Sequence, residues 1–358
     1  MKSDPAKMSA NGLHVRREVR GTRSKMKENG AEVKNMMLAG DIGGTKTLLG
    51  LFDPLPERPR PLVIRSFPTL MFDALPSMIR AFIKDADAGD VAIDSACFGV
   101  AGPVIGDAAT LTNVPWRVEA RGVQNAFGLR RVKLLNDLEA MAYSVPMLQE
   151  SEVHVLQEGE ALRGGNIALI AAGTGLGEAL LHNVDGRFIP SPTEAGHSDF
   201  AARTEREFTL VRALTQRYGR VEVERVVSGL GLANIHRVVH IEPCAAGIDP
   251  SDPGAPAEIY AAAQERRCLS CVEVLDIFVE AYGAEAGNLA LRTVATGGVF
   301  IGGGIAPKIL PLIAHGSFMR AFRAKSPLEP MLAKMPVKVI LNAEAGLLGA
   351  AVFAAAHR

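Results

Sequence analysis

The stretch AGDIGGTKTLLG, residues 39–50, lies between two apolar runs and nearly matches a phosphate-binding P-loop. A P-loop has a Gly, four further residues and then Gly-Lys-Ser/Thr. Here Gly40 begins the pattern and Lys46-Thr47 end it, but Thr45 occupies the place of the second Gly. The flanking residues predict strand, turn, strand, whereas a P-loop joins a strand to a helix whose N-terminus attracts the anion. The stretch therefore predicts a glycine hairpin and excludes a Walker nucleotidase.

The same arrangement returns about 130 residues later in the chain. NIALIAAGTGLGEALLHNVDG, residues 166–186, again predicts a strand, a turn with Gly173, Thr174 and Gly175, and a second strand. Strands alternate with helical patterns after each hairpin, which indicates an α/β fold with two related domains. A third cluster, Gly302, Gly303 and Gly304, follows a short predicted strand but lacks the GxGxxG spacing of a dinucleotide site.

Composition limits the classes of protein that fit the sequence. The chain has 358 residues, of which 48% are hydrophobic, which predicts about two domains with ample cores. Its formal net charge is zero, so no overall field attracts nucleic acid or a membrane, and no apolar run approaches the roughly 18 residues of a membrane span.

The first 35 residues have a different composition. They carry nine Lys/Arg against four Asp/Glu, without regular apolar periodicity. We interpret residues 1–36 as a disordered basic tail. Met36 or Met37 would make a sensible start, so the tail is not assumed to belong to the natural protein, and its glutamates argue against a transit peptide.

Four cysteines in a chain of this length do not form a disulfide framework, which predicts a reducing, cytoplasmic location. Cys268 and Cys271 form a CxxC in a segment of helical periodicity, with no second CxxC and no His pair nearby in the sequence. Two ordinary helical cysteines are the favoured interpretation, and zinc binding and redox chemistry are the alternatives.

The Gly-rich turns could bind phosphate. Without a Cβ, Gly43 and Gly44 allow backbone amides to approach phosphate oxygens, and Thr45 adds a hydroxyl donor. Asp41 at the head of the turn could hold a water bound to Mg²⁺. A plain hairpin with an Asx turn is the alternative for one such turn, but three glycine turns favour phosphate.

Other polar residues suggest a sugar site. Asn136-Asp137 ends a predicted strand and begins a helix, where the pair serves either as a helix cap or as a catalytic carboxylate at the carboxyl end of the strand. Glu194 and His197 lie in the Pro/Gly-rich segment PSPTEAGHSDF, where they could hydrogen-bond a polyol, although solvated loop carboxylates are common. Glu224 and Asn113 are unremarkable when taken alone.

Eight motifs together resemble the bacterial glucokinases of the hexokinase/actin-like ATPase superfamily, over residues 37–358. In chain order they are AGDIGGTKT, TNVPW, LLNDLEAMAYSV, AAGTGLGEALL, EAGHSDFA, ERVVSGLGLANIHR, GGVFIGGGIAPK and AGLLGAA. The repressor-related branch carries a Cys-rich zinc motif after a His, but here Ser-Asp follows His197. The chain therefore resembles the branch without that motif.

The resemblance implies an actin-like (ribonuclease H-like) α/β fold with an interdomain cleft. The small domain would span 37–147, with a C-terminal helix (341–358) returning to it, and the large domain 148–340. ATP would contact Gly40, Asp41, Ile42, Gly43, Gly44, Thr45, Gly173, Thr174, Gly175, Gly302, Gly303 and Gly304. Glucose would contact Asn113, Asn136, Asp137, Glu194, His197 and Glu224.

The implied reaction is the phosphorylation of D-glucose by ATP with Mg²⁺, the first step of glycolysis, with Asp137 as the general base. The resemblance also suggests a homodimer. Where a common form of the sugar loop has Gly-Glu-Gly-Gly-His, this chain has Thr193 and Ala195, and the extra methyl of Ala195 could shift the hexose preference. The alternatives are another hexose, an inactive sugar sensor, and a chaperone of the same superfamily, for which 358 residues leave no room.

Overall fold

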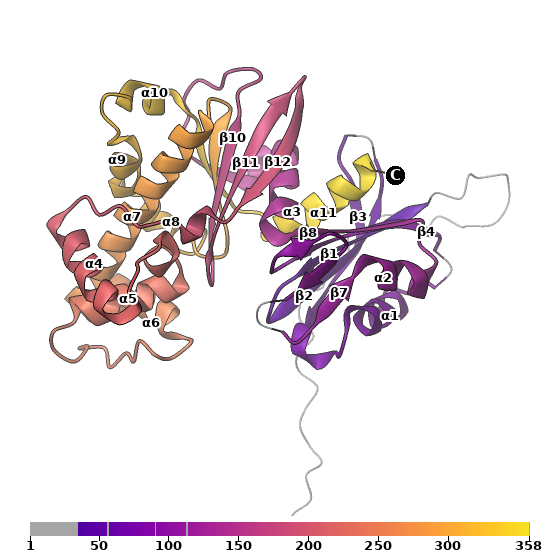
Figure 1. Cartoon of the computed structure of the whole chain (residues 1–358), viewed down its shortest axis with the longest axis horizontal. Coiled ribbons are helices and arrows are strands. Elements are labelled where there is room, and N and C mark those ends of the chain that lie inside the picture. The colour runs from indigo at the N-terminus through magenta and orange to yellow at the C-terminus, as the bar shows by residue number, and fades with distance from the viewer. Residues whose placement is uncertain (1–34, 56, 90, 112–113, 358) are drawn as a thin grey trace, which may run out of the picture. The chain divides into compact units, whose positions relative to one another are not determined.

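The computed structural model describes residues 35–55, 57–89, 91–111 and 114–357. These residues form two compact units (Figure 1). The first unit contains the described residues up to Asp137 together with the C-terminal residues from Ala350 onward. The second unit spans Leu138–Gly349. Within the described residues, no helix combines the length and the apolar character that crossing a bilayer requires.

The first unit contains a five-stranded sheet in the order β3-β2-β1-β4-β8 and a small three-stranded sheet, β5-β6-β7. Its strands are β1 (Met36–Ile42), β2 (Lys46–Asp53), β3 (Arg60–Pro68), β4 (Ile93–Val100), β5 (Val104–Ile105), β6 (Ala108–Thr110), β7 (Arg117–Glu119) and β8 (Arg131–Asn136). Helices α1 (Leu75–Asp85) and α2 (Ala120–Phe127) pack on the large sheet, with Ile79, Phe82 and Val123 buried against Leu49 and Phe98. A short 3-10 helix, η1 (Thr69–Met71), follows β3.

The second unit contains a six-stranded sheet in the order β12-β11-β10-β13-β14-β9. Its strands are β9 (Val153–Gln157), β10 (Ile167–Ala172), β11 (Leu176–Val184), β12 (Arg187–Thr193), β13 (Gly298–Gly302) and β14 (Val337–Ile340). Its longer helices are α4 (Glu205–Tyr218), α5 (Gly229–Val239), α6 (Ala255–Gln264) and α7 (Leu269–Thr293). Shorter elements are α8 (Leu310–Ala314), α9 (Ser317–Arg323), α10 (Glu329–Lys334) and the 3-10 helices η2 (Val145–Met147), η3 (Glu150–Glu152), η4 (Ala195–His197) and η5 (Val223–Arg225). Two helices, α3 (Asp137–Ser144) and α11 (Ala345–Ala356), cross the boundaries between the units.

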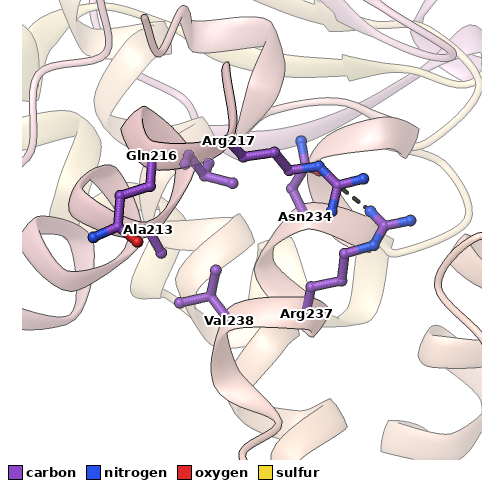
Figure 2. Close-up of a pocket in the computed structure, with 7 residues that line it drawn as sticks. Ala213, Gln216, Arg217, Asn234, Arg237 and Val238 are labelled. Carbon is purple, nitrogen blue, oxygen red and sulfur yellow. Dashed lines mark hydrogen bonds between the residues drawn. The ribbon is translucent and has the colours of Figure 1, made fainter. Parts of the chain in front are cut away.

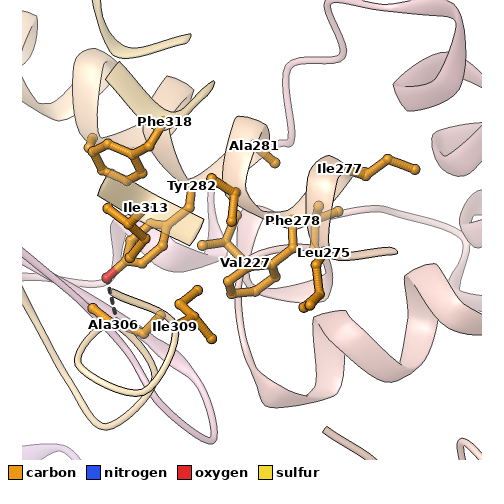
Figure 3. Packing of buried hydrophobic residues seen from close by; sticks show 14 of the residues in the cluster. Val227, Leu275, Ile277, Phe278, Ala281, Tyr282, Ala306, Ile309, Ile313 and Phe318 are labelled. Carbon is orange, nitrogen blue, oxygen red and sulfur yellow. Dashed lines mark hydrogen bonds between the residues drawn. The ribbon is translucent and has the colours of Figure 1, made fainter. Parts of the chain in front are cut away.

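The core of the second unit forms around α7, which is buried on most of its circumference, as expected for an apolar helix inside a domain. Phe278 and Tyr282 of α7 pack with Ile313 and Phe318 (Figure 3). A separate cluster, which includes Leu138, Leu169 and Ala345, joins α3, the sheet and the start of α11. Helices therefore pack against the sheet with two separate sets of apolar residues, which is the layering of an α/β unit.

The two sheets share one pattern. β1 pairs antiparallel with β2 and parallel with β4, and β10 pairs antiparallel with β11 and parallel with β13. Both predicted glycine hairpins are confirmed, and β13 ends at Gly302 as predicted. The segment before Glu194 differs from the prediction of a loop, because Pro190 and Pro192 lie in β12. This strand is at the edge of its sheet, where a missing N–H donor is tolerated.

Candidate active site

The hairpin between β1 and β2 is held by a threonine from η1. The Gly43 N–H donates to the Lys46 carbonyl at 3.1 Å and closes the turn. Thr69 Oγ1 donates to the Gly43 carbonyl at 2.8 Å, and the Thr69 N–H donates to the Thr45 carbonyl at 3.0 Å. Thr69 is fully buried and also contacts Thr47 Oγ1 at 2.9 Å. The turn is thus braced through its carbonyls by a residue that the sequence analysis missed.

Three predicted nucleotide-site residues of this hairpin have different surroundings. Gly43 must lack a side chain, because a Cβ there would lie 2.8 Å from the Lys46 carbonyl oxygen. Gly40 is required by packing within β1, since a Cβ would lie 2.5 Å from the ring of Phe98. Ile42 is buried in the core, so only its backbone could contact a ligand.

Two carboxylates lie at one edge of the first sheet. β4 pairs with β1 on one side and with β8 on the other, and this register places Asp41 opposite Gly99 and Asn136 opposite Val100. Asp137 follows directly as the first residue of α3. Burial and the nearby carboxylate of Asp137 raise the pKa of Asp41 to about 6, although Lys46 acts in the opposite direction. The carboxyl edge of this sheet therefore concentrates negative charge beside the hairpin.

Of the two asparagines predicted to bind sugar, the structure describes only Asn136. Asn136 Nδ2 donates to the Gly102 carbonyl at 3.3 Å, which fixes the amide toward the loop after β4. Asn113 lies outside the described residues.

The second hairpin, between β10 and β11, adjoins the start of α5. The Gly173 N–H donates to the Gly175 carbonyl, and the Gly229 N–H donates to the Gly173 carbonyl, both at 2.8 Å. Ser228 caps α5 by accepting from the Gly231 N–H at 3.0 Å. Thr174 at the tip is exposed. The positive end of the α5 dipole thus lies beside this turn, which favours an anion there.

The third glycine turn is joined to β10 by Tyr282. The Tyr282 hydroxyl accepts from the Ala172 N–H at 3.2 Å and donates to the Gly302 carbonyl at 3.4 Å. Gly303 has φ of +83°, and a Cβ on it would lie 2.3 Å from the Ala172 carbonyl oxygen. Gly304 is exposed. The carboxyl ends of β10 and β13, with their two turns, are therefore fixed to each other in this unit.

Glu194, His197 and Glu224 belong to segments that pair with each other. The Val223 N–H donates to the Ser198 carbonyl at 2.9 Å, which joins η5 to the end of η4. Glu224 Oε2 accepts from the Leu176 N–H at 2.8 Å, directly after the Gly173–Gly175 turn. Glu194 and His197 are exposed. The second unit thus brings three predicted sugar ligands close to its first glycine turn, although Glu194 and Glu224 are 30 residues apart in the sequence.

A hollow of about 340 Å³ lies between α4 and α5, apart from the three glycine turns (Figure 2). Arg217, Asn234 and Arg237 lie along it, and Arg237 Nη1 donates to Asn234 Oδ1 at 3.3 Å. None of the predicted site residues lines this hollow.

Glu178, on β11, gives a testable pH dependence of stability. Burial and the facing carboxylate of Glu285 raise its pKa from 4.5 to about 8, opposed by Arg292 at 3.6 Å, and Tyr282 also faces it. Between these two pKa values the folded state binds one more proton than the unfolded state. The free energy of unfolding should therefore fall with rising pH, by about 1.4 kcal/mol per unit from this group.

Glu178→Gln should remove this contribution, because the amide is neutral at every pH. We expect denaturant unfolding between pH 5 and 8 to show a flatter slope for this variant than for the parent chain. Glu160→Gln is the matched control, since Glu160 is exposed and its ion pair with Lys334 is a surface contact. An identical slope in all three proteins would contradict the prediction.

The sequence model of the family described as Glucokinase matches residues 38–357. A glucokinase of Nostoc punctiforme is 38% identical over 339 residues, covering 89% of this chain and 99% of that protein. The crystal structure of a glucokinase from an Antarctic psychrotroph is 28% identical with a TM-score of 0.79, covering 89% and 98%. A glucokinase from Streptomyces griseus, solved in complex with glucose and AMPPNP, is similar in fold, with a TM-score of 0.59 at 22% identity over 89% and 99% of the two chains.

Proposed function

This chain belongs to the glucokinase family of enzymes, and on that basis we propose that it transfers the γ-phosphoryl group of ATP to the 6-hydroxyl of glucose with Asp137 as the general base. The observation that carries the proposal is the pair of carboxylates, Asp41 and Asp137, at the sheet edge that the β1–β2 hairpin adjoins. Carboxyl ends of strands are where α/β proteins place their ligands.

Asp137 would accept the proton of the sugar hydroxyl as its oxygen attacks the γ-phosphorus and the bond to ADP breaks. In phosphoryl transfer, the protein mainly positions the reactants and stabilises charge on the phosphoryl oxygens. Backbone amides of the turns at Gly43–Thr45, Gly173–Gly175 and Gly302–Gly304 would bind ATP, except the Gly43 and Gly173 N–H groups, which close their own turns. Glu194, His197 and Glu224, with Asn113 and Asn136, would hold the sugar hydroxyls.

Asp41, beside the carboxylate of Asp137, fits a magnesium ion. Carboxylate oxygens are hard ligands of the kind that Mg²⁺ prefers. The raised pKa of Asp41 reflects its burial and the repulsion between the two carboxylates, which a divalent cation would relieve. Asp41 would hold the ion through a bound water. When bound with ATP, Mg²⁺ would offset negative charge on the phosphates.

The test is ADP release from Mg-ATP by the purified chain, without sugar and with glucose, mannose, fructose and glucosamine in separate reactions. Strong release with glucose and little with the others would support the proposal. Preference for another hexose would keep the chemistry and direct attention to Ala195. No sugar-dependent release from folded protein would favour the sensor alternative. The homodimer and the cytoplasmic location stay predictions.

Thr69→Val should weaken ATP binding. The valine keeps the shape of Thr69 but removes the hydroxyl that donates to the Gly43 carbonyl, so the phosphate hairpin loses a brace. A lost buried hydrogen bond costs about 1–2 kcal/mol, and we expect the KM for ATP to rise about tenfold with little change in the KM for glucose. Steady-state kinetics with each substrate varied would check this. Thr69→Ser, which keeps the hydroxyl, should behave like the parent chain.

A further inference from the structure

Five potential metal ligands meet at the junction of α5 and α7. His236 and His240 lie at the end of α5, and Cys244 follows in the loop to α6. Cys268 is the N-cap of α7 and Cys271 lies in its first turn, so Cys268 is not inside a helix as the sequence analysis expected. The sequence hides this group, because 24 residues separate Cys244 from Cys268.

Four distances among His240, Cys244, Cys268 and Cys271 match edges of a tetrahedral zinc site. Cys244 Sγ lies 3.8 Å from both Cys268 Sγ and Cys271 Sγ. His240 Nε2 lies 3.3 Å from Cys268 Sγ and 3.9 Å from Cys271 Sγ. A tetrahedron with the usual Zn–S and Zn–N bond lengths has S···S edges of about 3.8 Å and N···S edges of about 3.6 Å.

His240 is oriented as zinc-bound histidines are. Its Nδ1 lies 2.9 Å from the His236 carbonyl oxygen. If Nδ1 carries the proton and donates there, Nε2 presents its lone pair to the three sulfurs. Donation of the second ring N–H to a backbone carbonyl is the common arrangement around metal-bound imidazoles.

His236 lies beside the group as a fifth, buried donor. Its side chain is 2% exposed, and neither ring nitrogen has a hydrogen-bond partner among the described residues. Buried polar groups are nearly always paired. The ring stacks on His240 with centroids 3.8 Å apart, and ligand atoms of His236, His240, Cys244 and Cys271 all lie within 4.8 Å of one another.

A disulfide explains this arrangement less well. It would join two sulfurs at about 2.05 Å and leave the third thiol and His240 without a role. In the structure, Cys244 Sγ is equally far from the sulfurs of Cys268 and Cys271, and His240 Nε2 provides the fourth donor atom. Three sulfurs and one nitrogen are a typical donor set for structural zinc.

We propose that His240, Cys244, Cys268 and Cys271 bind one Zn²⁺ ion as a closed structural site, with His236 stacked beside it. The ion would tie the end of α5, the following loop and the start of α7 together. Arg237 Nη2 already donates to the Pro250 carbonyl in that loop at 2.6 Å. The site is separate from the Cys-rich motif of the repressor-related branch, which would follow His197.

Metal content of the purified full-length chain tests the proposal. We expect about one zinc per chain, resistant to gel filtration and released by a thiol-reactive mercurial. Cys271→Ser and His240→Ala should each lower the content by at least about tenfold, and Co²⁺ in place of zinc should give thiolate charge-transfer bands that both variants lose. Cys97→Ser is the matched control, because Cys97 is a buried cysteine of β4 in the other unit, and it should keep its zinc.

Circular dichroism and hexose turnover of each variant would separate loss of metal from loss of folding, and chelation should lower the melting temperature of the parent chain. If Cys271→Ser or His240→Ala unfolds, Cys244→Ser takes its place in the test, because Cys244 lies in a loop and not in a helix. Absence of zinc after refolding with excess Zn²⁺, or full zinc in Cys271→Ser, would overturn the proposal. Retention of zinc in Cys268→Ser together with its loss in His236→Gln would overturn the ligand set.

Discussion

Asp137→Asn should lower kcat for glucose by about 10³-fold, within the range that general-base catalysis contributes. The amide keeps the size of the carboxylate and one hydrogen-bond acceptor, but it cannot take the proton of the attacking hydroxyl. Glucose affinity should change little, because the other sugar ligands remain. Steady-state turnover and calorimetric titration with glucose would measure the two effects separately.

Asp107→Asn is the matched control in the same unit. Asp107 is exposed and its amine partner, Lys133 Nζ, is 3.8 Å away, so its charge contributes little. Its turnover should equal that of the parent chain. If Asp137→Asn keeps full turnover, Asp137 is not the base. If it loses glucose binding in proportion to turnover, Asp137 acts mainly in holding the sugar.

Local patterns predicted the parts of the candidate site that are contiguous in sequence. The two hairpins followed from glycines between apolar runs, and Asn136-Asp137 followed from the residue types favoured where a strand meets a helix. In these cases the backbone conformation and the chemistry are specified by the same few residues.

The rest depends on contacts between distant segments. Thr69 reaches the first hairpin from 26 residues away, and Tyr282 reaches the Ala172 N–H across 110 residues. Neither residue is unusual in its own segment, so no local signal identifies it. Glu224 was predicted as a sugar ligand, but its hydrogen bond to the Leu176 N–H required the folded chain.

The same limit applies to His240 and Cys268. The CxxC was visible in the sequence, and its interpretation as two helical cysteines rested on helical periodicity and on the lack of a second CxxC and of a His pair nearby in the sequence. The turn between α6 and α7 returns the chain to the end of α5, where Cys268 Sγ lies 3.3 Å from His240 Nε2. The spacing of these residues along the chain therefore did not reveal that they form one cluster in the fold.

Gly196→Ala should lower kcat/KM for glucose by about 10²-fold, because shifts of about 1 Å in positioning residues have effects of that size. A Cβ on Gly196 would lie 2.2 Å from the Leu176 carbonyl oxygen and 3.2 Å from its carbon. Backbone atoms of β11 cannot yield as a flexible side chain would, so η4 must move. Glu194 and His197, on either side of Gly196, would move with it. Kinetics with glucose and with ATP varied separately would show whether the loss falls on the sugar.

Ala195→Gly is the matched control, since it removes a methyl group at the neighbouring position, whereas Gly196→Ala adds one. Ala195 is half-buried, and the common form of this loop has glycine there. We expect its kcat/KM for glucose to stay within about threefold of the parent value, since the substitution introduces no clash and costs only about 1 kcal/mol in chain entropy. Equal activity of both variants would show that the contact between Gly196 and Leu176 does not position the sugar ligands. A loss confined to Gly196→Ala, with an unchanged circular dichroism spectrum, would tie the geometry of η4 to sugar phosphorylation.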